Sequence, residues 1–164
     1  KLKNLEMLID AFAEARKRHS NISLTLIGEG LELQKLKVKS EKLKISGMVE
    51  FKNPMSRDKI LEEIAQSDLV VLPSLSDVSP NLLMDALAVG TPFLATQENG
   101  LREVLGGAGT WFNPMSKEDF TNKLESLLAP GSLEKARNQI KSFPYRKTWE
   151  DVAEEYEQIF KDVV

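Results

Sequence analysis

Two aspartates near the start of an expected helix are the residues best suited to chemistry. Asp77 and Asp85 have seven residues between them, and Ser79 and Pro80 stand where the helix is expected to begin. Serine is a preferred N-cap, and proline suits the first helical position. A helix start presents unpaired N–H groups and the positive end of a dipole, which together attract anions. Carboxylates beside such a start predict a ligand with both phosphate and hydroxyl groups, such as a nucleotide sugar.

A parallel sheet is the element expected to position these aspartates. Residues 68–72 carry a continuous apolar stretch, which is typical of a strand covered on both faces. Strands that alternate with helices of this length predict an α/β fold with a doubly wound parallel sheet, whose ligands bind outside the carboxyl ends of the strands. The loops after residues 27, 51, 72 and 95 should therefore share one edge. Expected strands span 22–27, 48–51, 68–72, 92–95 and 109–112, and expected helices cover or begin at 5–12, 31–43, 56–64, 79, 101–105 and 116.

The composition favours one globular domain and disfavours a metal site. The chain has 164 residues, 41% of them hydrophobic, which is enough for a core. It has no cysteine and one histidine, so thiolate and histidine metal sites and a Ser-His triad are implausible. We expect His19 to be a solvated residue at the end of a basic helix tail. No apolar run approaches the ~20 residues that cross a bilayer.

The charge pattern argues against nucleic acid as a partner. The formal net charge is −3 with both signs mixed, whereas nucleic-acid binding needs a basic surface. A local basic stretch lies between Lys35 and Lys44, and we expect it to be an exposed helix face. The alternative is a weak contact with a membrane surface, where each lysine near anionic lipid contributes ~1 kcal/mol.

The two ends of the sequence each carry a further signal. The chain opens with Lys1-Leu2-Lys3 directly into a helix, which indicates a fragment cut from a longer protein. Near the other end, apolar residues recur at helical spacing, and we expect this stripe to pack on the core. Its members are Trp149, Val152, Ala153, Tyr156, Ile159, Phe160 and Val163.

A pair of glycines follows the first expected strand. Gly28 and Gly30 do not make the dinucleotide fingerprint, because no third glycine follows at the required spacing. They indicate either a tight turn between a strand and a helix or a place where bare backbone approaches a ligand closely.

Several motifs together resemble the carboxyl-terminal half of a retaining glycosyltransferase of family 4. The family has the GT-B architecture, in which two Rossmann-like domains face each other. The resemblance covers nearly the whole chain and implies that residues 1–164 are the nucleotide-sugar-binding domain, without its first strand and without the amino-terminal acceptor domain. The similar pieces are Lys3-Asn4, residues 8–12, residues 26–30, Val49-x-Phe51, Pro73-Ser74, the acids at 77 and 85, residues 86–92, residues 99–104 and Gly109.

The resemblance also implies roles for individual residues. Asp77 matches the first acid of the family's Glu-x7-Glu motif, which faces the donor sugar at the catalytic centre, and Asp85 matches the second, which binds ribose hydroxyls. Lys3 matches a basic residue that pairs with the diphosphate. Backbone amides would hold the sugar and the distal phosphate, and two further residues fall in the base-contacting loop. The amides belong to Ser79, Pro80, Asn81, Leu82 and Leu83, and the loop residues are Met55 and Arg57.

The chain departs from the family pattern at several positions. Both acids are aspartate and not glutamate, so each is shorter by one methylene. Asn53 and Pro54 occupy a turn where the family usually has glycine. The family's arginine just upstream of Lys3 is absent.

The resemblance implies an enzyme that moves a hexose from a GDP- or UDP-linked sugar to a glycan or a lipid-linked acceptor, in a setting such as lipopolysaccharide synthesis. The acceptor would bind through the other domain, so the fragment alone should be inactive. No cofactor, metal or nucleic acid is implied. The expected location is the cytoplasm, with peripheral association of the parent at the inner face of the membrane. The alternatives are a non-catalytic nucleotide- or sugar-binding module and a GT-B sugar-nucleotide epimerase, although His19 is poorly placed for the latter.

Overall fold

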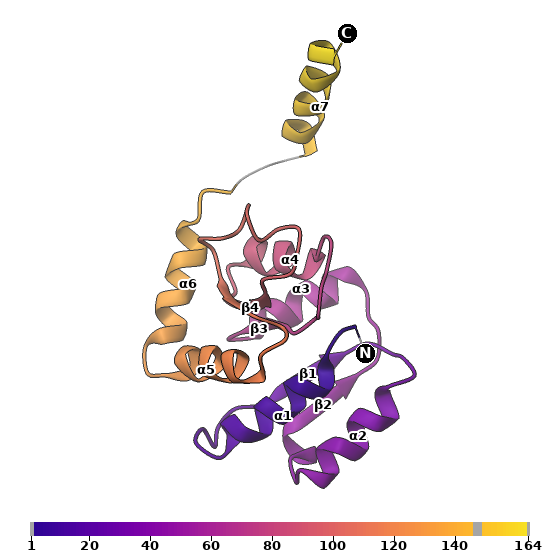
Figure 1. Cartoon of the computed structure of the whole chain (residues 1–164), viewed down its shortest axis with the longest axis vertical. Helices are drawn as coiled ribbons and strands as arrows, with labels where there is room; N and C mark the ends of the chain where they lie inside the picture. The colour runs from indigo at the N-terminus through magenta and orange to yellow at the C-terminus, as the bar shows by residue number, and fades with distance from the viewer. Residues whose placement is uncertain (1, 146–148, 164) are drawn as a thin grey trace.

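The computed structural model describes residues 2–145 and 149–163, and it has the parallel α/β fold that the sequence predicts. Helices and strands alternate along most of the chain (Figure 1). The elements are α1 (Leu5–Arg16), β1 (Leu24–Ile27), α2 (Leu33–Lys42), the 3-10 helix η1 (Ser46–Met48), β2 (Val49–Lys52), α3 (Arg57–Gln66), β3 (Val70–Leu72), α4 (Asn81–Val89), β4 (Phe93–Thr96), β5 (Thr110–Phe112), α5 (Lys117–Leu128), α6 (Ser132–Ser142) and α7 (Trp149–Val163).

Hydrogen bonding divides the strands into two parallel sheets where the sequence suggested one. β1 pairs with β2, with Leu24 opposite Val49, and β4 lies between β3 and β5 in a second sheet. Among the described residues, no ladder joins β1 to β3. Side chains of β1 and β3 nevertheless pack into one apolar cluster, which includes Leu24, Leu26 and Val71. Packing therefore holds the two sheets together at this junction.

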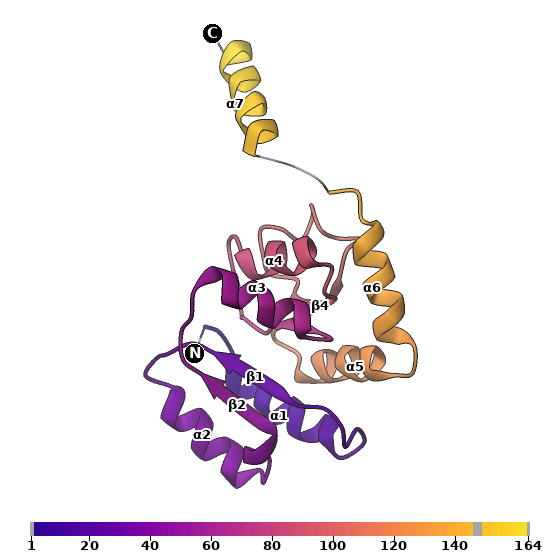
Figure 2. The same ribbon diagram turned by 180° about the vertical axis from the view of Figure 1, so that it is seen from behind.

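Alternate residues of the second sheet face two different cores. In β4, Phe93 and Ala95 pack with α3 and α4, whereas Leu94 packs with α1 and α5. All residues of β4 are buried, as expected for a strand covered on both faces. The helix pairs α3–α4 and α1–α5 are in contact, and both views show α3 beside α4 (Figures 1 and 2). The expected double winding is thus present around β4.

Hydrogen bonds link the amino-terminal segment to the loop after β3. The N–H of Leu75 donates to the carbonyl of Leu2 at 2.9 Å. The start of α1 is thereby fixed beside the segment that leads from β3 to α4. This link brings residue Lys3 to the carboxyl edge of the sheet, where ligands of such folds bind.

Two local expectations are wrong, and a third is largely confirmed. Residues 101–105 form turns and no regular helix, although Leu105 N–H donates to Leu101 O at 2.8 Å. His19 is half-buried and lies 2.9 Å from Glu125 of α5, so it is not simply solvated. The basic stretch is an exposed face of α2, as expected, although Lys35 donates to Glu6 and the half-buried Lys39 donates to Asp10 of α1.

The apolar stripe near the carboxyl end does not pack on the core. α7 projects away from the rest of the molecule (Figures 1 and 2). Tyr156, Ile159 and Phe160 are exposed, with the Tyr156 and Phe160 rings 6.4 Å apart. The side chains of Trp149 and Val163 lie outside the described residues. The helix forms as its spacing predicts, but most of the described side chains of its stripe are exposed to solvent. No described helix is both long enough and apolar enough to span a bilayer.

Replacing Ser116 with alanine should lower the free energy of unfolding by about 1 kcal/mol, because Ser116 caps α5. Its hydroxyl accepts a hydrogen bond from Asp119 N–H at 3.1 Å. The matched control is Ser56→Ala, since Ser56 stands at the N-cap of α3 without a side-chain cap bond. Urea unfolding of the two variants measures the difference. Equal losses in both would contradict the capping role.

Candidate functional site

The start of α4 is the centre of the candidate site. The helix begins at Asn81, one position later than expected, and Pro80 is its N-cap. Proline has no N–H and no side-chain acceptor, so within the described chain no side chain caps α4. The N–H of Leu83 donates to Pro80 O at 3.0 Å. Five residues were expected to offer backbone amides to a ligand. Pro80 has no N–H, and the N–H of Leu83 is already bonded. The remaining candidate donors are Ser79, Asn81 and Leu82.

Asp77 lies in the loop between β3 and α4 and forms an ion pair with Lys3. Lys3 Nζ donates to Asp77 Oδ2 at 2.8 Å, across 74 positions of sequence. The carboxylate is mostly covered, whereas the lysine is largely exposed. An aspartate and a lysine from distant segments thus meet at the carboxyl edge of the sheet. Lys3 was expected to bind phosphate and Asp77 to face the sugar. In this structure the two side chains contact each other.

The backbone of Asp77 is held by the loop after β4. Asp77 forms an isolated parallel bridge with Asn99, and its N–H donates to Glu98 O at 3.0 Å. Gly100 N–H reaches both Asp77 O and Val78 O at 3.2 Å. A β-carbon at Gly100 would lie 2.2 Å from Val78 O, so this close approach requires glycine. The sequence placed Asn99 and Gly100 in a motif but did not assign them this supporting role.

Asp85 lies in the second turn of α4 and forms an ion pair with Arg57. Arg57 Nη2, at the first position of α3, donates to Asp85 Oδ1 at 2.9 Å. The contact follows from the packing of α3 against α4. The Asp85 side chain is 12% exposed, whereas the Arg57 side chain is 76% exposed. The ion pair therefore joins a mostly covered carboxylate to a guanidinium that is open to solvent.

The other candidate residues lie on neighbouring loops of the same edge. Gly28 and Gly30 have φ values of +142° and +154°, which residues with a β-carbon rarely adopt. Gly28 N–H also donates to Lys52 O at 3.0 Å, which extends the pairing of β1 with β2. Met55 is half-buried before α3. In the described part of the chain, no hydrogen bond or ion pair joins these residues to Asp77 or Asp85.

One buried group at this edge was missed by sequence reasoning. Ser74 is fully buried directly after β3, and its hydroxyl oxygen has no hydrogen-bond partner among the described residues. Buried hydroxyls are normally bonded, so an orphan next to a candidate site is notable. The Pro73-Ser74 pair was the only available sequence signal.

The charges at this edge are mostly paired. Beyond the two aspartates, Glu63 accepts a hydrogen bond from Lys52 at 2.6 Å, and this bond raises the pKa of Lys52 above its usual value. No group of three His, Cys, Asp or Glu side chains suited to a metal ion occurs within the described ranges. The carboxylates of Asp77 and Asp85 could accept hydrogen bonds from hydroxyl groups. The cations beside them and the uncapped start of α4 could attract phosphate.

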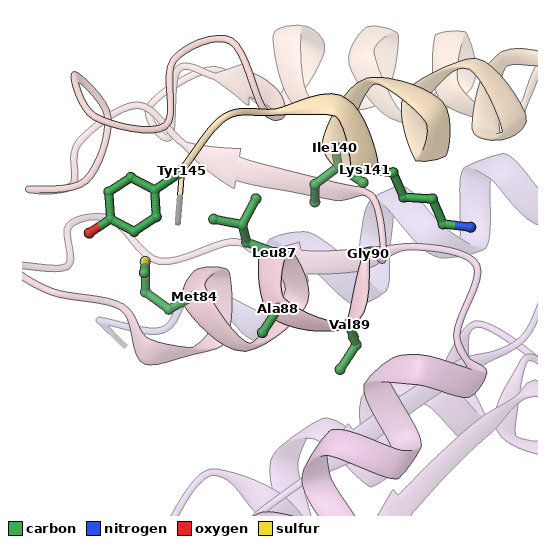
Figure 3. Close-up of a pocket in the computed structure, with 8 residues that line it drawn as sticks. All are labelled: Met84, Leu87, Ala88, Val89, Gly90, Ile140, Lys141 and Tyr145. Atoms are coloured by element: carbon green, nitrogen blue, oxygen red, sulfur yellow. The ribbon is translucent and has the colours of Figure 1, made fainter. Parts of the chain in front are cut away.

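The pocket shown in Figure 3 lies elsewhere on α4. It has a volume of about 410 Å³ and contains neither aspartate. Its lining comes from α4, α6 and the segment after α6: Met84, Leu87, Ala88, Val89, Gly90, Ile140, Lys141 and Tyr145. This lining has no carboxylate to accept hydrogen bonds from sugar or ribose hydroxyls. The candidate site is therefore the open edge at the start of α4.

Sequence comparison finds relatives over nearly all of the chain. Residues 1–158 match the family described as Glycosyl transferases group 1. The chain is 25% identical to a D-inositol 3-phosphate glycosyltransferase of Corynebacterium jeikeium, over 99% of this chain and 41% of that protein. It is 27% identical to a lipopolysaccharide 1,2-N-acetylglucosaminetransferase of Salmonella typhimurium, over 98% of this chain and 45% of that protein. The chain thus spans about two fifths of the length of these relatives.

Solved structures have the same fold. WaaG, a glycosyltransferase involved in lipopolysaccharide biosynthesis, has a TM-score of 0.72 and 26% identity, over 87% of this chain and 40% of that chain. Anabaena Alr3699/HepE in complex with UDP-glucose has a TM-score of 0.74 and 19% identity, over 86% of this chain and 40% of that chain. At that identity the second match speaks for the fold alone.

Proposed function

Because the chain belongs to the group 1 glycosyltransferases, we propose that it is the part of a larger retaining hexosyltransferase that binds the nucleotide-sugar donor. The observation that carries this proposal is a pair of aspartate–cation contacts beside an uncapped helix start, one at Asp77 in the loop before α4 and one at Asp85 in the second turn of α4. Such a surface suits a ligand that combines a diphosphate with two sets of hydroxyls, and a sugar linked to UDP or GDP has this chemistry.

The donor would lie along the start of α4. The diphosphate would face the amides of Asn81 and Leu82, with Lys3 as its counter-charge. Asp77 would accept hydrogen bonds from the sugar and Asp85 from the ribose. Asp85 follows Asn81 by four residues, ~6 Å along a helix axis, which is a fitting separation for neighbouring parts of one nucleotide. Lys3 would then exchange its contact with Asp77 for the phosphate.

Catalysis would depend on stabilising the departing diphosphate. Lys3 and the free amides of α4 supply preorganised positive charge where negative charge develops. Asp77 would orient the sugar and stabilise positive charge at its anomeric carbon. Closure of a second domain over the donor would exclude water from the reacting bond.

We propose that residues 1–164 are the donor-binding half of that enzyme and that the acceptor binds to another domain of the intact protein. A further parallel strand between β1 and β3 would complete the sheet, because it gives the strand order of a doubly wound fold. Support comes from the edges of β1 and β3, which carry no ladder to each other in the described structure. The chain alone would then lack transferase activity. The proposed acceptor is a glycan or a lipid-linked sugar, reached by peripheral contact at the inner face of a membrane.

Nucleoside diphosphates should raise the thermal midpoint of the intact protein. A ligand at one hundred times its Kd that binds only the folded state adds about 2.7 kcal/mol to its stability. We expect UDP or GDP to give this shift and the corresponding nucleoside, without phosphates, to give much less. Release of free UDP or GDP with transfer of a radiolabelled sugar would then distinguish an enzyme from a binding module. A midpoint unchanged by every nucleoside diphosphate would contradict the proposal.

A further inference from the structure

We propose that a second pocket, separate from the candidate site, binds a phosphate group. It lies between α1, the end of α2 and the start of α5, and it has a volume of about 400 Å³. The basic stretch between Lys35 and Lys44, which the proposed function leaves unused, ends at this pocket. None of the lining residues was assigned to the nucleotide-sugar donor, so the inference does not rest on the proposed function. The basic side chains in the lining are Arg16, Lys17, Lys44 and Lys117.

The two acids in the lining already have lysine partners. Asp10 accepts a hydrogen bond from Lys39 at 2.8 Å, and Glu14 accepts one from Lys17 at 2.8 Å. The bond from Lys17 lowers the pKa of Glu14 below its usual value, and the charges of further cations, Lys117 among them, lower it more. Positive charge therefore prevails in the pocket, and its carboxylates do not neutralise the remaining cations.

Arg16 provides a donor whose orientation is already fixed. The residue is half-buried, and its Nη1 donates to the backbone carbonyls of Ser20 and Ile22, the second at 3.0 Å. These bonds hold the plane of the guanidinium, while its Nε and Nη2 form no hydrogen bond within the described residues. A guanidinium donates two parallel hydrogen bonds to a phosphate, and one that is already oriented loses little freedom when it does so.

Two lysines of the pocket occupy positions where local structure favours other residues. Lys44 follows α2 with a φ of +58°, a conformation that usually belongs to glycine at the end of a helix. Lys39 and Lys42 in the last turn already suit the helix dipole, so the dipole does not call for a third lysine. Lys117 is the first residue of α5, where the dipole disfavours a cation. Both side chains are exposed, and neither forms an ion pair with a described residue. Residues that break local rules are expected at functional sites.

The pocket lies where the two halves of the fold meet. Lys44 precedes β2 of the first sheet and Lys117 follows β5 of the second, while α1, which carries Arg16, contacts both α2 and α5. A phosphate bound by these three side chains would link two sheets that no strand ladder joins in the described structure. Either a soluble phosphorylated molecule or a lipid headgroup could supply such a group.

Binding of two phosphate probes to the intact protein tests the proposal. Inorganic pyrophosphate, measured by titration calorimetry, represents a soluble ligand. Vesicles of phosphatidylglycerol in phosphatidylcholine, measured by co-sedimentation, represent a lipid headgroup. In at least one arm, Lys44→Gln combined with Lys117→Gln should weaken binding about tenfold, since one exposed ion pair contributes up to about fivefold. The matched control, Lys59→Gln combined with Lys135→Gln, makes the same charge change at exposed positions of α3 and α6 and should stay within about twofold.

The two arms identify the class of ligand, and the variants identify the site. A loss with pyrophosphate assigns the pocket to a soluble phosphorylated molecule, and a loss with vesicles alone assigns it to a lipid headgroup. No binding in either arm would overturn the proposal. Equal losses in the pocket variant and the control would do the same, because they would show only a diffuse effect of charge.

A further variant separates this pocket from the start of α4, where pyrophosphate could also bind. If Lys3→Gln weakens pyrophosphate binding and the pocket variant does not, and vesicle binding is also unchanged, the second site does not exist. The pocket variant should keep the affinity of the natural protein for UDP and GDP, so failure of the proposed function would be seen separately. Matching thermal midpoints without ligand show that each variant is folded.

Discussion

Replacing Asp85 with alanine should weaken the affinity of the intact protein for its nucleoside diphosphate by about ten- to a hundredfold. The change removes the carboxylate that would accept a ribose hydroxyl, and hydrogen bonds to charged groups contribute about 1.5–3 kcal/mol. It also releases Arg57 from its 2.9 Å contact with Asp85. Titration calorimetry with UDP and GDP measures the loss of affinity.

Folding should be much less affected than binding by this substitution. Arg57 is largely exposed, so removing its partner leaves no buried unpaired charge. The matched control is Asp58→Ala, which removes an exposed carboxylate of α3 next to Arg57. It should leave nucleotide affinity within about twofold, since a surface charge contributes less than ~1 kcal/mol. An Asp85→Ala protein that binds as tightly as the natural one would exclude Asp85 from the donor site.

Replacing Gly109 with alanine should lower the free energy of unfolding by about 3 kcal/mol. A β-carbon at this position would lie 1.9 Å from Cε2 of Phe93. Phe93 is 1% exposed and packs edge-on against Trp111, with ring centroids 5.4 Å apart. Because the ring is buried in the core cluster and packs on Trp111, it could move only by displacing its neighbours, and the strain would spread to β4 and β5. Urea unfolding measures the loss through the denaturation midpoint.

Gly47 provides the control for Gly109. It lies in η1, and a β-carbon there would meet no atom within 4 Å. Gly47→Ala should therefore change the free energy of unfolding by less than about 1 kcal/mol. The change should be stabilising, because alanine lowers the conformational entropy of the unfolded chain. Similar midpoints for the two alanine variants would show that the Phe93 ring yields easily.

The sequence predicted strands better than it predicted irregular segments. β3 was expected because residues 68–72 are continuously apolar, and β4 was expected over 92–95. Side chains of both strands lie in two different cores. Residues 101–105 resembled a helix only over one turn. There Arg102 stacks on Trp111 with its guanidinium 4.8 Å from the ring centroid, and Trp111 Nε1 donates to Gly106 O at 3.0 Å. Such contacts from a strand further along the chain leave no signal in local spacing.

The candidate site shows the same limit. The spacing of Asp77 and Asp85 could be read directly, because both flank or belong to one helix. The cations that pair with the two aspartates could not be predicted from spacing, because Arg57 is 28 positions from Asp85 and Lys3 is 74 positions from Asp77. Periodicity reports which face a residue occupies within its own element. The packing of α3 on α4, and of the amino-terminal segment on the loop after β3, decides which charges meet.

The separation of β1–β2 from β3–β4–β5 has a consequence for the chain when it is handled on its own. Strand edges without a neighbour are templates for pairing with other molecules, and proteins normally protect them. The edges of β1 and β3 that carry no ladder to each other are backed by apolar side chains, and they invite strand exchange between copies. Purified alone, the 164-residue chain should self-associate in a concentration-dependent way, and a short synthetic strand peptide that occupies both edges should keep it monomeric.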